Sequence, residues 1–128
     1  DDSYNANPGS TAAAIATLAL EDGEAWLVLG DMKELGPDAA RLHADIGALA
    51  RARGIARLYS VGPLAQAASA AFGAGAQHFA DQAALIDALR AELHAGVCCL
   101  VKGSRSSAME RVVAALLGKN DGGDAHAA

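Results

Sequence analysis

The sequence has 128 residues, of which 52% are hydrophobic, 20% are charged and only 4% are aromatic, with a formal net charge of −5. This length suits one domain, and so large an apolar share excludes intrinsic disorder over most of the chain. The acidic balance argues against a nucleic-acid surface, which needs clustered Lys and Arg, and no apolar run approaches the ~18 residues of a membrane span. The adjacent Cys98 and Cys99 lie in an apolar run, which suits buried, reduced thiols. These features predict a soluble cytoplasmic domain.

The two ends of the sequence predict a piece of a longer chain with a tail. The polar run at residues 1–8 is of the kind that follows a strand, so we expect that strand upstream of residue 1. From Gly118 onward Gly, Asp, Ala and His dominate the sequence. We therefore expect a folded domain over residues 1–117 and a disordered tail over residues 118–128.

Between these ends, helical and strand patterns alternate along the chain. A first helix is expected from an N-cap at Ser10 to Leu20, followed by a buried strand over 25–29 that Gly30 closes. The later elements are helices over 38–53, 64–72, 81–94 (capped by Asp81) and 107–117, and strands over 55–61, 77–79 and 97–101. The strand over 77–79 has the weakest pattern, and the strand over 97–101 has the strongest.

This alternation predicts an α/β fold, a mostly parallel Rossmann-like sheet with helices on both faces. Ligands of such sheets bind at the carboxyl ends of the strands. Three polar segments are expected to meet there: the first loop (residues 2–7), the second loop (residues 30–36) and the third loop (residues 102–107). The sequence therefore places the candidate site at this edge.

The second loop places Asp31, Lys33 and Glu34 between two glycines, directly after a buried strand. Charges at such a strand end can hold a zwitterion, with the carboxylates meeting an amine and Lys33 meeting a carboxylate. The alternative is that Asp31 caps the following turn while the other side chains are solvated. The pattern alone leaves both interpretations open.

The third loop carries Lys102, Ser104 and Arg105 into the last helix, so the cations and the free N–H groups of the turn can bind a carboxylate or a phosphate. The alternative is an ordinary capped helix with a surface arginine. The first loop offers carboxylate, hydroxyl, phenol and carboxamide groups that suit a nucleotide, although a plain Asx turn would use some of them too.

Other polar residues have a simpler interpretation. His43 lies on the longest helix near the second loop, where a surface or packing role is favoured over a role in the site. His78 and His94 are separated by a whole helix, so a metal cluster is not expected. The sequence shows neither a Ser-His-Asp nor a Cys-His arrangement, and no self-sufficient catalytic set.

Taken together, the three loops resemble the C-terminal domain of the Mur ligase family. The resemblance rests on residues 2–8, on residues 30–36 with His43 beyond them, and on residues 102–105 followed by Met109-Glu110, and it covers roughly residues 1–117. The run Ser-Tyr-Asn-Ala-Asn-Pro resembles the family members that act on D-Ala-D-Ala. Thr11 departs from the pattern, since the family more often has Met there. Because we expect this position to open a helix, the departure puts little in doubt.

This resemblance implies one domain of an ATP-dependent amide ligase in peptidoglycan precursor synthesis. Such enzymes use ATP and Mg²⁺ to add D-Ala-D-Ala to UDP-MurNAc-tripeptide through an acyl phosphate. The P-loop and most metal ligands lie in a central domain, and the UDP-sugar peptide is held by an N-terminal domain, both of the same chain. The C-terminal domain completes the ATP pocket and brings the dipeptide, so alone it is expected to be inactive.

The resemblance also implies roles for individual residues. Residues that bind the nucleotide cofactor are expected in the first loop, with Asp2 accepting from the ribose and Tyr4, Asn5 and Asn7 lining the adenine or phosphate side. The dipeptide is expected to contact Asp31, Lys33 and Glu34, while its carboxylate or the developing negative charge meets Lys102, Ser104 and Arg105. No metal ligand and no sole acid or base is expected here.

Two other functions compete with this interpretation. One is a related ligase, of the Mur or folylpolyglutamate type, that uses another acceptor. The other is a non-catalytic α/β module that binds a nucleotide or an amino acid. Such a module predicts tight binding by this chain alone, whereas the ligase predicts weak binding because most ATP contacts belong to another domain.

Overall fold

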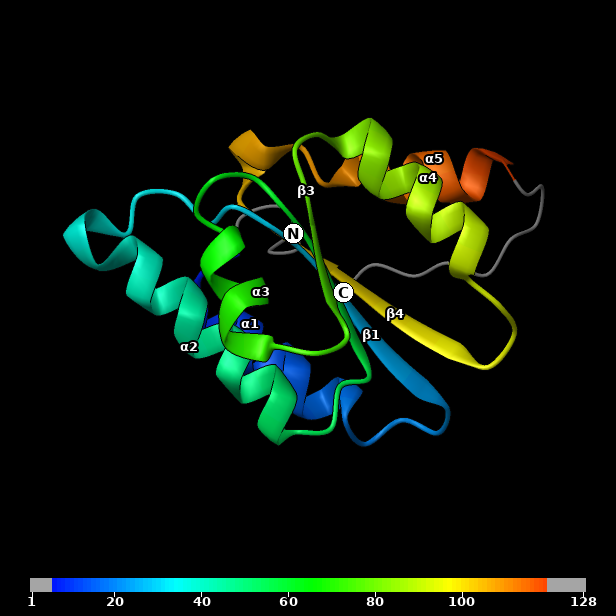
Figure 1. Cartoon of the computed structure of the whole chain (residues 1–128), viewed down its shortest axis with the longest axis horizontal. Coiled ribbons are helices and arrows are strands. Elements are labelled where there is room, and N and C mark those ends of the chain that lie inside the picture. The colour runs from blue at the N-terminus through cyan, green and yellow to red at the C-terminus, as the bar shows by residue number, and fades with distance from the viewer. Residues whose placement is uncertain (1–5, 120–128) are drawn as a thin grey trace.

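A computed structural model describes residues 6–119, which form a parallel sheet covered by helices (Figure 1). The strands are β1 (Glu24–Gly30), β2 (Arg57–Val61), β3 (Ala76–Phe79) and β4 (Val97–Lys102), in the order β3-β2-β1-β4. The helices are α1 (Pro8–Leu18), α2 (Ala39–Ala52), α3 (Gln66–Phe72), α4 (Gln82–Glu92) and α5 (Glu110–Lys119). Every strand pair is parallel, which confirms the predicted fold class.

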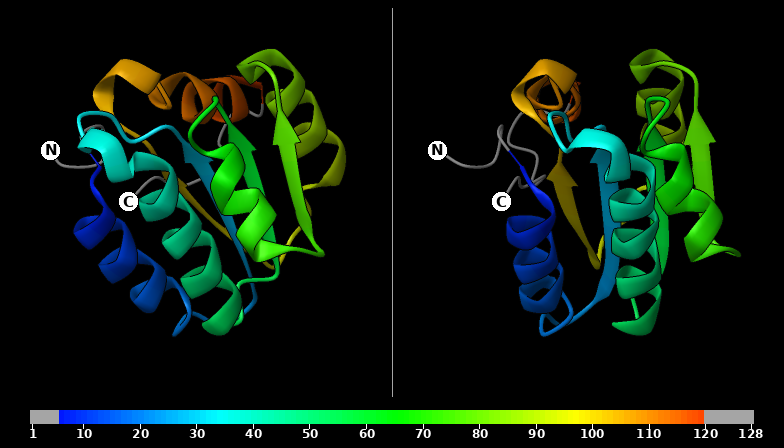
Figure 2. Two further views of the ribbon diagram at one scale, coloured as in Figure 1. Left: turned by 60° about the vertical axis from the view of Figure 1, so that its left-hand side comes forward. Right: turned by 90° about the vertical axis from the view of Figure 1, so that its left-hand side faces the viewer.

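Helices cover both faces of this sheet, as predicted (Figures 1 and 2). Along β1, side chains alternate between the faces, so Leu27 and Leu29 pack in the core under α1, α2 and α3. Trp26 and Val28 pack in the second core, under α4 and α5. All four side chains are fully buried, and residues 25–29 of β1 form an uninterrupted apolar run, the pattern of a strand inside a parallel sheet.

The register of β1 sets which loops become neighbours. Its end pairs with the ends of both adjacent strands, with Leu29 opposite Lys102 of β4 and Gly30 opposite Val61 of β2. The second and third loops therefore leave the sheet side by side, together with the turn that follows β2.

The start of α1 differs from the prediction, in which Ser10 is the N-cap. Asn7 is the N-cap, and its side chain accepts from the Ser10 backbone N–H at 2.9 Å. The Ser10 hydroxyl in turn accepts from the Asn7 backbone N–H at 3.2 Å, which completes a capping box. Pro8 lacks a backbone N–H, but no intrahelical donor is needed at the first helical position, so the helix begins at Pro8 and includes the Pro-Gly pair.

Thr11 consequently lies inside α1 rather than at its opening. It is fully buried, and its hydroxyl donates to the sulfur of Met32 at 3.5 Å. The sequence predicts little consequence for the departure at Thr11, because it places the residue at the start of the helix. The structure corrects this, since the departure falls on a buried contact with the second loop.

The last helix also begins later than predicted. A short 3₁₀ turn spans Arg105–Ser107, Ala108 then adopts a left-handed conformation with φ of 54°, and α5 starts at Glu110. The left-handed residue interrupts the helical path that the apolar spacing suggested. At its other end α5 continues to Lys119, two residues past the predicted end at residue 117.

None of the helices within residues 6–119 combines the length and hydropathy needed to span a membrane. Cys98 and Cys99 are free thiols, and both are half-buried rather than buried.

A polar network on β2 anchors α4 to the sheet. Tyr59 is fully buried; its hydroxyl donates to a Glu92 carboxylate oxygen and accepts from Arg57 at 3.0 Å. Burial, followed by the contact with Glu92, raises the pKa of Tyr59 from the ordinary 10.0 to about 12. The neutral phenol is therefore favoured in the folded state.

This pKa shift predicts a pH dependence of stability. Because the folded pKa lies above the unfolded one, the contribution of Tyr59 is complete below pH 10 and declines as the pH rises toward about 12. We expect the urea-derived free energy of unfolding to fall more steeply across this range in the wild type than in Tyr59→Phe. Parallel pH profiles of the two proteins would contradict the assignment.

Candidate functional site

The three loops meet at the carboxyl edge of the sheet, as far as the described residues reach. The backbone N–H of Ala6 donates to Gly103 at 3.3 Å, and the N–H of Ser104 donates to Asp31 at 3.0 Å. This confirms the predicted meeting of the second and third loops and of the end of the first loop. The candidate nucleotide residues Asp2, Tyr4 and Asn5 lie outside the described residues.

Two serines of the third loop tie the second loop to it. The Ser104 hydroxyl accepts from the Lys33 backbone N–H at 2.7 Å and donates to the Ala6 carbonyl at 3.5 Å. The Ser107 hydroxyl donates to the Asp31 carbonyl at 2.5 Å. Ser104, predicted as a ligand of a carboxylate, thus lies between loops and is 7% exposed.

Asp31 holds the turn that leads into α3, rather than the turn that follows Asp31 itself in the sequence. Its Oδ1 accepts from the backbone N–H groups of Leu64 at 3.0 Å and Ala65 at 2.7 Å, at the entry to α3. Gly62, with φ of 107°, makes room for this carboxylate, because a Cβ there would lie 2.4 Å from Oδ1. Asp31 is 3% exposed, so it is primarily part of the protein's own framework.

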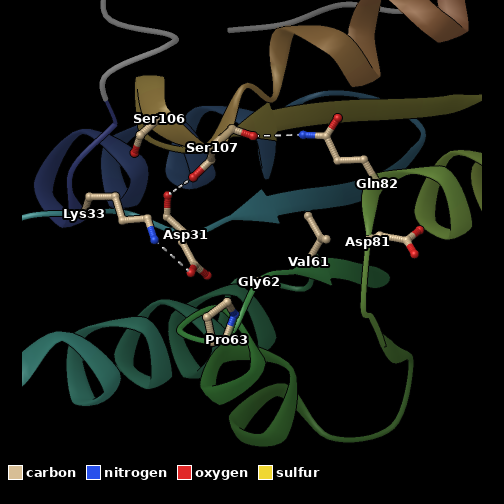
Figure 3. Close-up of a pocket in the computed structure, with 9 residues that line it drawn as sticks. All are labelled: Asp31, Lys33, Val61, Gly62, Pro63, Asp81, Gln82, Ser106 and Ser107. Atoms are coloured by element: carbon tan, nitrogen blue, oxygen red, sulfur yellow. Dashed lines mark hydrogen bonds and ion pairs between the residues drawn. The ribbon is translucent and has the colours of Figure 1, made fainter.

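The other oxygen of Asp31 faces a pocket and pairs with Lys33. The Asp31 Oδ2 and the Lys33 Nζ are 3.5 Å apart, and the Lys33 side chain is 46% exposed (Figure 3). The pocket has a volume of about 280 Å³ and is lined by Asp31, Lys33, Val61, Gly62, Pro63, Asp81, Gln82, Ser106 and Ser107. Residues at the carboxyl ends of all four strands contribute to it, as expected for a ligand site of a parallel sheet.

The pocket residues that follow β2 and β3 are not among those predicted from the sequence. Gln82, after β3, donates to the carbonyls of Ser107 at 2.8 Å and Ala108 at 3.2 Å, which holds the third loop in place (Figure 3). Asp81 accepts from the Ala84 N–H at 2.9 Å, which confirms it as the cap of α4. Because ligands bind at the carboxyl ends of parallel strands, the fold points to both turns. Their side chains carry little charge, so the sequence pattern does not single them out.

The remaining predicted site residues lie outside this pocket. Glu34 and Arg105 are exposed, whereas Lys102 at the end of β4 is only 4% exposed. Asn7 is exposed, and its carboxamide oxygen accepts from the Ser10 backbone N–H as the N-cap of α1. Of the predicted dipeptide ligands, the structure brings Asp31 and Lys33 together, with Ser106 and Ser107 as the nearby hydroxyls in place of Ser104.

His43 has the packing role that the sequence favoured. It is fully buried and bonds to the backbone of Met32 and of Ala39. Among residues 6–119 there is no group of three His, Cys, Asp or Glu side chains that could hold a metal ion. The pocket instead combines an accessible ammonium, a carboxylate and hydroxyl groups, which suits a small zwitterionic or carboxylate ligand.

Comparisons with known proteins agree on one family. The family described as "Mur ligase, glutamate ligase domain" matches residues 2–105. The UDP-N-acetylmuramoyl-tripeptide–D-alanyl-D-alanine ligase of Escherichia coli (strain K12) is 51% identical over an alignment of 119 residues that covers 91% of this chain and 26% of that protein. The chain thus spans about a quarter (26%) of the length of this curated relative.

Solved structures show the same fold. MurF from Acinetobacter baumannii aligns with a TM-score of 0.80 at 33% identity, covering 92% of this chain and 27% of that one. The MurF ligase of Thermotoga maritima, in complex with ADP, aligns with a TM-score of 0.76 at 27% identity, covering 88% of this chain and 26% of that one.

Proposed function

This chain belongs to the Mur ligase family as its glutamate ligase domain, and from that premise we propose that it is the C-terminal domain of an ATP-dependent ligase in peptidoglycan precursor synthesis. The parent enzyme joins D-Ala-D-Ala to UDP-MurNAc-tripeptide, the reaction for which the Escherichia coli relative is named. ATP first phosphorylates the terminal carboxylate of the tripeptide. The dipeptide amine then attacks the acyl phosphate, and the tetrahedral intermediate releases phosphate to leave an amide.

The pocket at the carboxyl edge supports a role in holding the incoming dipeptide. A dipeptide carries one ammonium and one carboxylate, and the pocket presents the Asp31 carboxylate beside the Lys33 ammonium at 3.5 Å. In the proposed complex Lys33 meets the dipeptide carboxylate together with Ser106, while Asp31 Oδ2 faces the amine. This pairing of opposite charges in one pocket is the observation that carries the proposal.

Residues around the pocket complete the proposed site. Glu34, Lys102, Ser104 and Arg105 belong to the same two loops and are proposed to act at its rim, toward the carboxylate or the charge that develops on the acyl phosphate. Asp2, Tyr4, Asn5 and Asn7 are proposed to face ATP, in keeping with the ADP bound to the Thermotoga maritima relative. Closure of this domain over the others would exclude water from a reactive acyl phosphate.

Mg²⁺ enters the proposal as a cofactor of the parent enzyme. The residues of the described part do not fit a complete magnesium site, since no group of three acidic, His or Cys side chains gathers there. As the family resemblance implies, the metal ligands and the P-loop are proposed to lie in the central domain of the parent chain, and this chain alone is expected to show no turnover.

Phosphate release by the intact parent chain tests this function. We expect ATP-dependent release with UDP-MurNAc-tripeptide that requires D-Ala-D-Ala. Release that instead requires a different amine would indicate a related ligase. Folded protein without release, together with tight nucleotide or amino-acid binding by this chain alone, would favour the non-catalytic module.

A further inference from the structure

A buried histidine of α2 holds the backbone of the second loop. His43 is fully buried, and its Nε2 lies 2.9 Å from the backbone nitrogen of Met32. Its Nδ1 lies 2.7 Å from the carbonyl oxygen of Ala39, one turn earlier in the same helix. The ring thus connects the first turn of α2 to the residue between Asp31 and Lys33.

The two partners of His43 define the tautomer of its ring in this arrangement. The Met32 N–H can only donate, so Nε2 must accept and carries no proton. The Ala39 carbonyl can only accept, so Nδ1 carries the proton. Because the Ala39 carbonyl of the helix accepts the Nδ1 proton, the unprotonated Nε2 stays directed toward the backbone of the second loop.

The second loop needs such an external tie because its own path is unfavourable. Glu34 adopts a left-handed conformation with φ of 62°, although it is not a glycine. On the other side of Lys33, the Met32 side chain is fully buried, and its sulfur accepts a hydrogen bond from the Thr11 hydroxyl. Met32 and the Lys33 N–H are therefore held by neighbouring elements while the Lys33 side chain extends to the pocket.

We propose that His43 is a positioning residue for the incoming dipeptide. By accepting from Met32, it fixes the peptide that precedes Lys33, so that the ammonium stands beside Asp31 at the pocket. Without this acceptor the Met32 N–H would be buried and unsatisfied, and the loop would shift to reach water. The inference rests on the proposed function for the identity of the ligand, but not for the loop geometry.

Two substitutions separate the acceptor from the packing. His43→Gln keeps an acceptor at about the position of Nε2, because the Gln carbonyl oxygen can reach the Met32 N–H. His43→Leu keeps apolar volume and has no acceptor. Ile46→Val is the matched control, since Ile46 lies on the same helix, is 3% exposed, and does not contact the second loop through hydrogen bonds.

The test uses the full-length ligase and two measurements. Hydrogen exchange, followed by mass spectrometry on the peptide that contains Met32 and Lys33, is expected to be faster in His43→Leu and near the wild-type rate in His43→Gln and Ile46→Val. In phosphate-release assays, the KM for D-Ala-D-Ala is expected to rise about fivefold or more in His43→Leu, with the KM for ATP unchanged and with rescue in His43→Gln.

Each outcome decides one of the two proposals. Unchanged exchange in His43→Leu would overturn the positioning role, whatever the activity. Faster exchange with an unchanged KM for the dipeptide would also overturn it. A wild-type enzyme that releases no phosphate would contradict the proposed function alone, and the exchange data would still decide whether His43 fixes the loop.

Discussion

Replacing Asp31 with alanine is expected to lower the free energy of unfolding of the domain by about 3 kcal/mol, because two backbone donors at the entry to α3 lose their acceptor. Each unsatisfied donor costs about 1–3 kcal/mol when it stays away from water. Urea unfolding of this chain, compared with the wild type, measures the loss. The substitution also removes the partner of Lys33 at the pocket.

The matched variant Asp31→Asn separates these two roles of the carboxylate. Its amide oxygen can still accept from Leu64 and Ala65, so we expect a loss of stability of about 1 kcal/mol. Its amide nitrogen is neutral and cannot pair with Lys33, so in the parent ligase use of the dipeptide is still expected to suffer. Equal stability of Asp31→Ala and the wild type would show that the hydrogen bonds from Leu64 and Ala65 to Asp31 contribute nothing to the free energy of unfolding.

Replacing Lys33 with methionine is expected to raise the KM of the parent ligase for D-Ala-D-Ala about thirtyfold. Methionine keeps most of the side-chain length but lacks the charge. A hydrogen bond to a charged group contributes about 1.5–3 kcal/mol, and a loss of about 2 kcal/mol corresponds to a factor of about 30 in binding. Steady-state phosphate release with varied dipeptide, at saturating ATP and UDP-MurNAc-tripeptide, gives the measurement.

The control for this substitution removes a positive charge elsewhere. Arg53 is exposed at the C-terminal end of α2, away from the pocket residues. Arg53→Met therefore changes the net charge as Lys33→Met does, and we expect both KM values to stay at the wild-type level. A rise in the KM for ATP as large as that for the dipeptide in Lys33→Met would contradict the assignment of the second loop.

Much of the fold could be predicted because hydrophobic periodicity and chain order specify it. The apolar run around Leu27 predicts a strand buried on both faces, and alternation with helices then implies a parallel sheet. Element boundaries were less predictable where local chemistry overrides periodicity. The cap of α1 depends on reciprocal bonds of Asn7 and Ser10, and the start of α5 depends on the left-handed backbone of Ala108.

The location of the site could also be predicted, but the direction of its side chains could not. Strand order brings the second and third loops together, irrespective of the directions in which their side chains point. Whether Ser104 or Ser106 faces the pocket depends on the 3₁₀ turn over Arg105–Ser107 in the third loop, which the sequence does not reveal. Likewise, Asp31 contacts Leu64 and Ala65, which lie 33 and 34 positions further along the chain, so no local sequence pattern predicts this contact.

The placement of β4 beside β1 has a consequence for the order in which the molecule assembles. The ties from Ser104 to Lys33 and from Ser107 to Asp31 span 71 and 76 positions, whereas β1 and β2 are joined through α2 alone. Because closing a long loop costs more entropy than closing a short one, units of local sequence can form before β4 docks. We therefore expect the pocket to become complete only after β4 has docked beside β1.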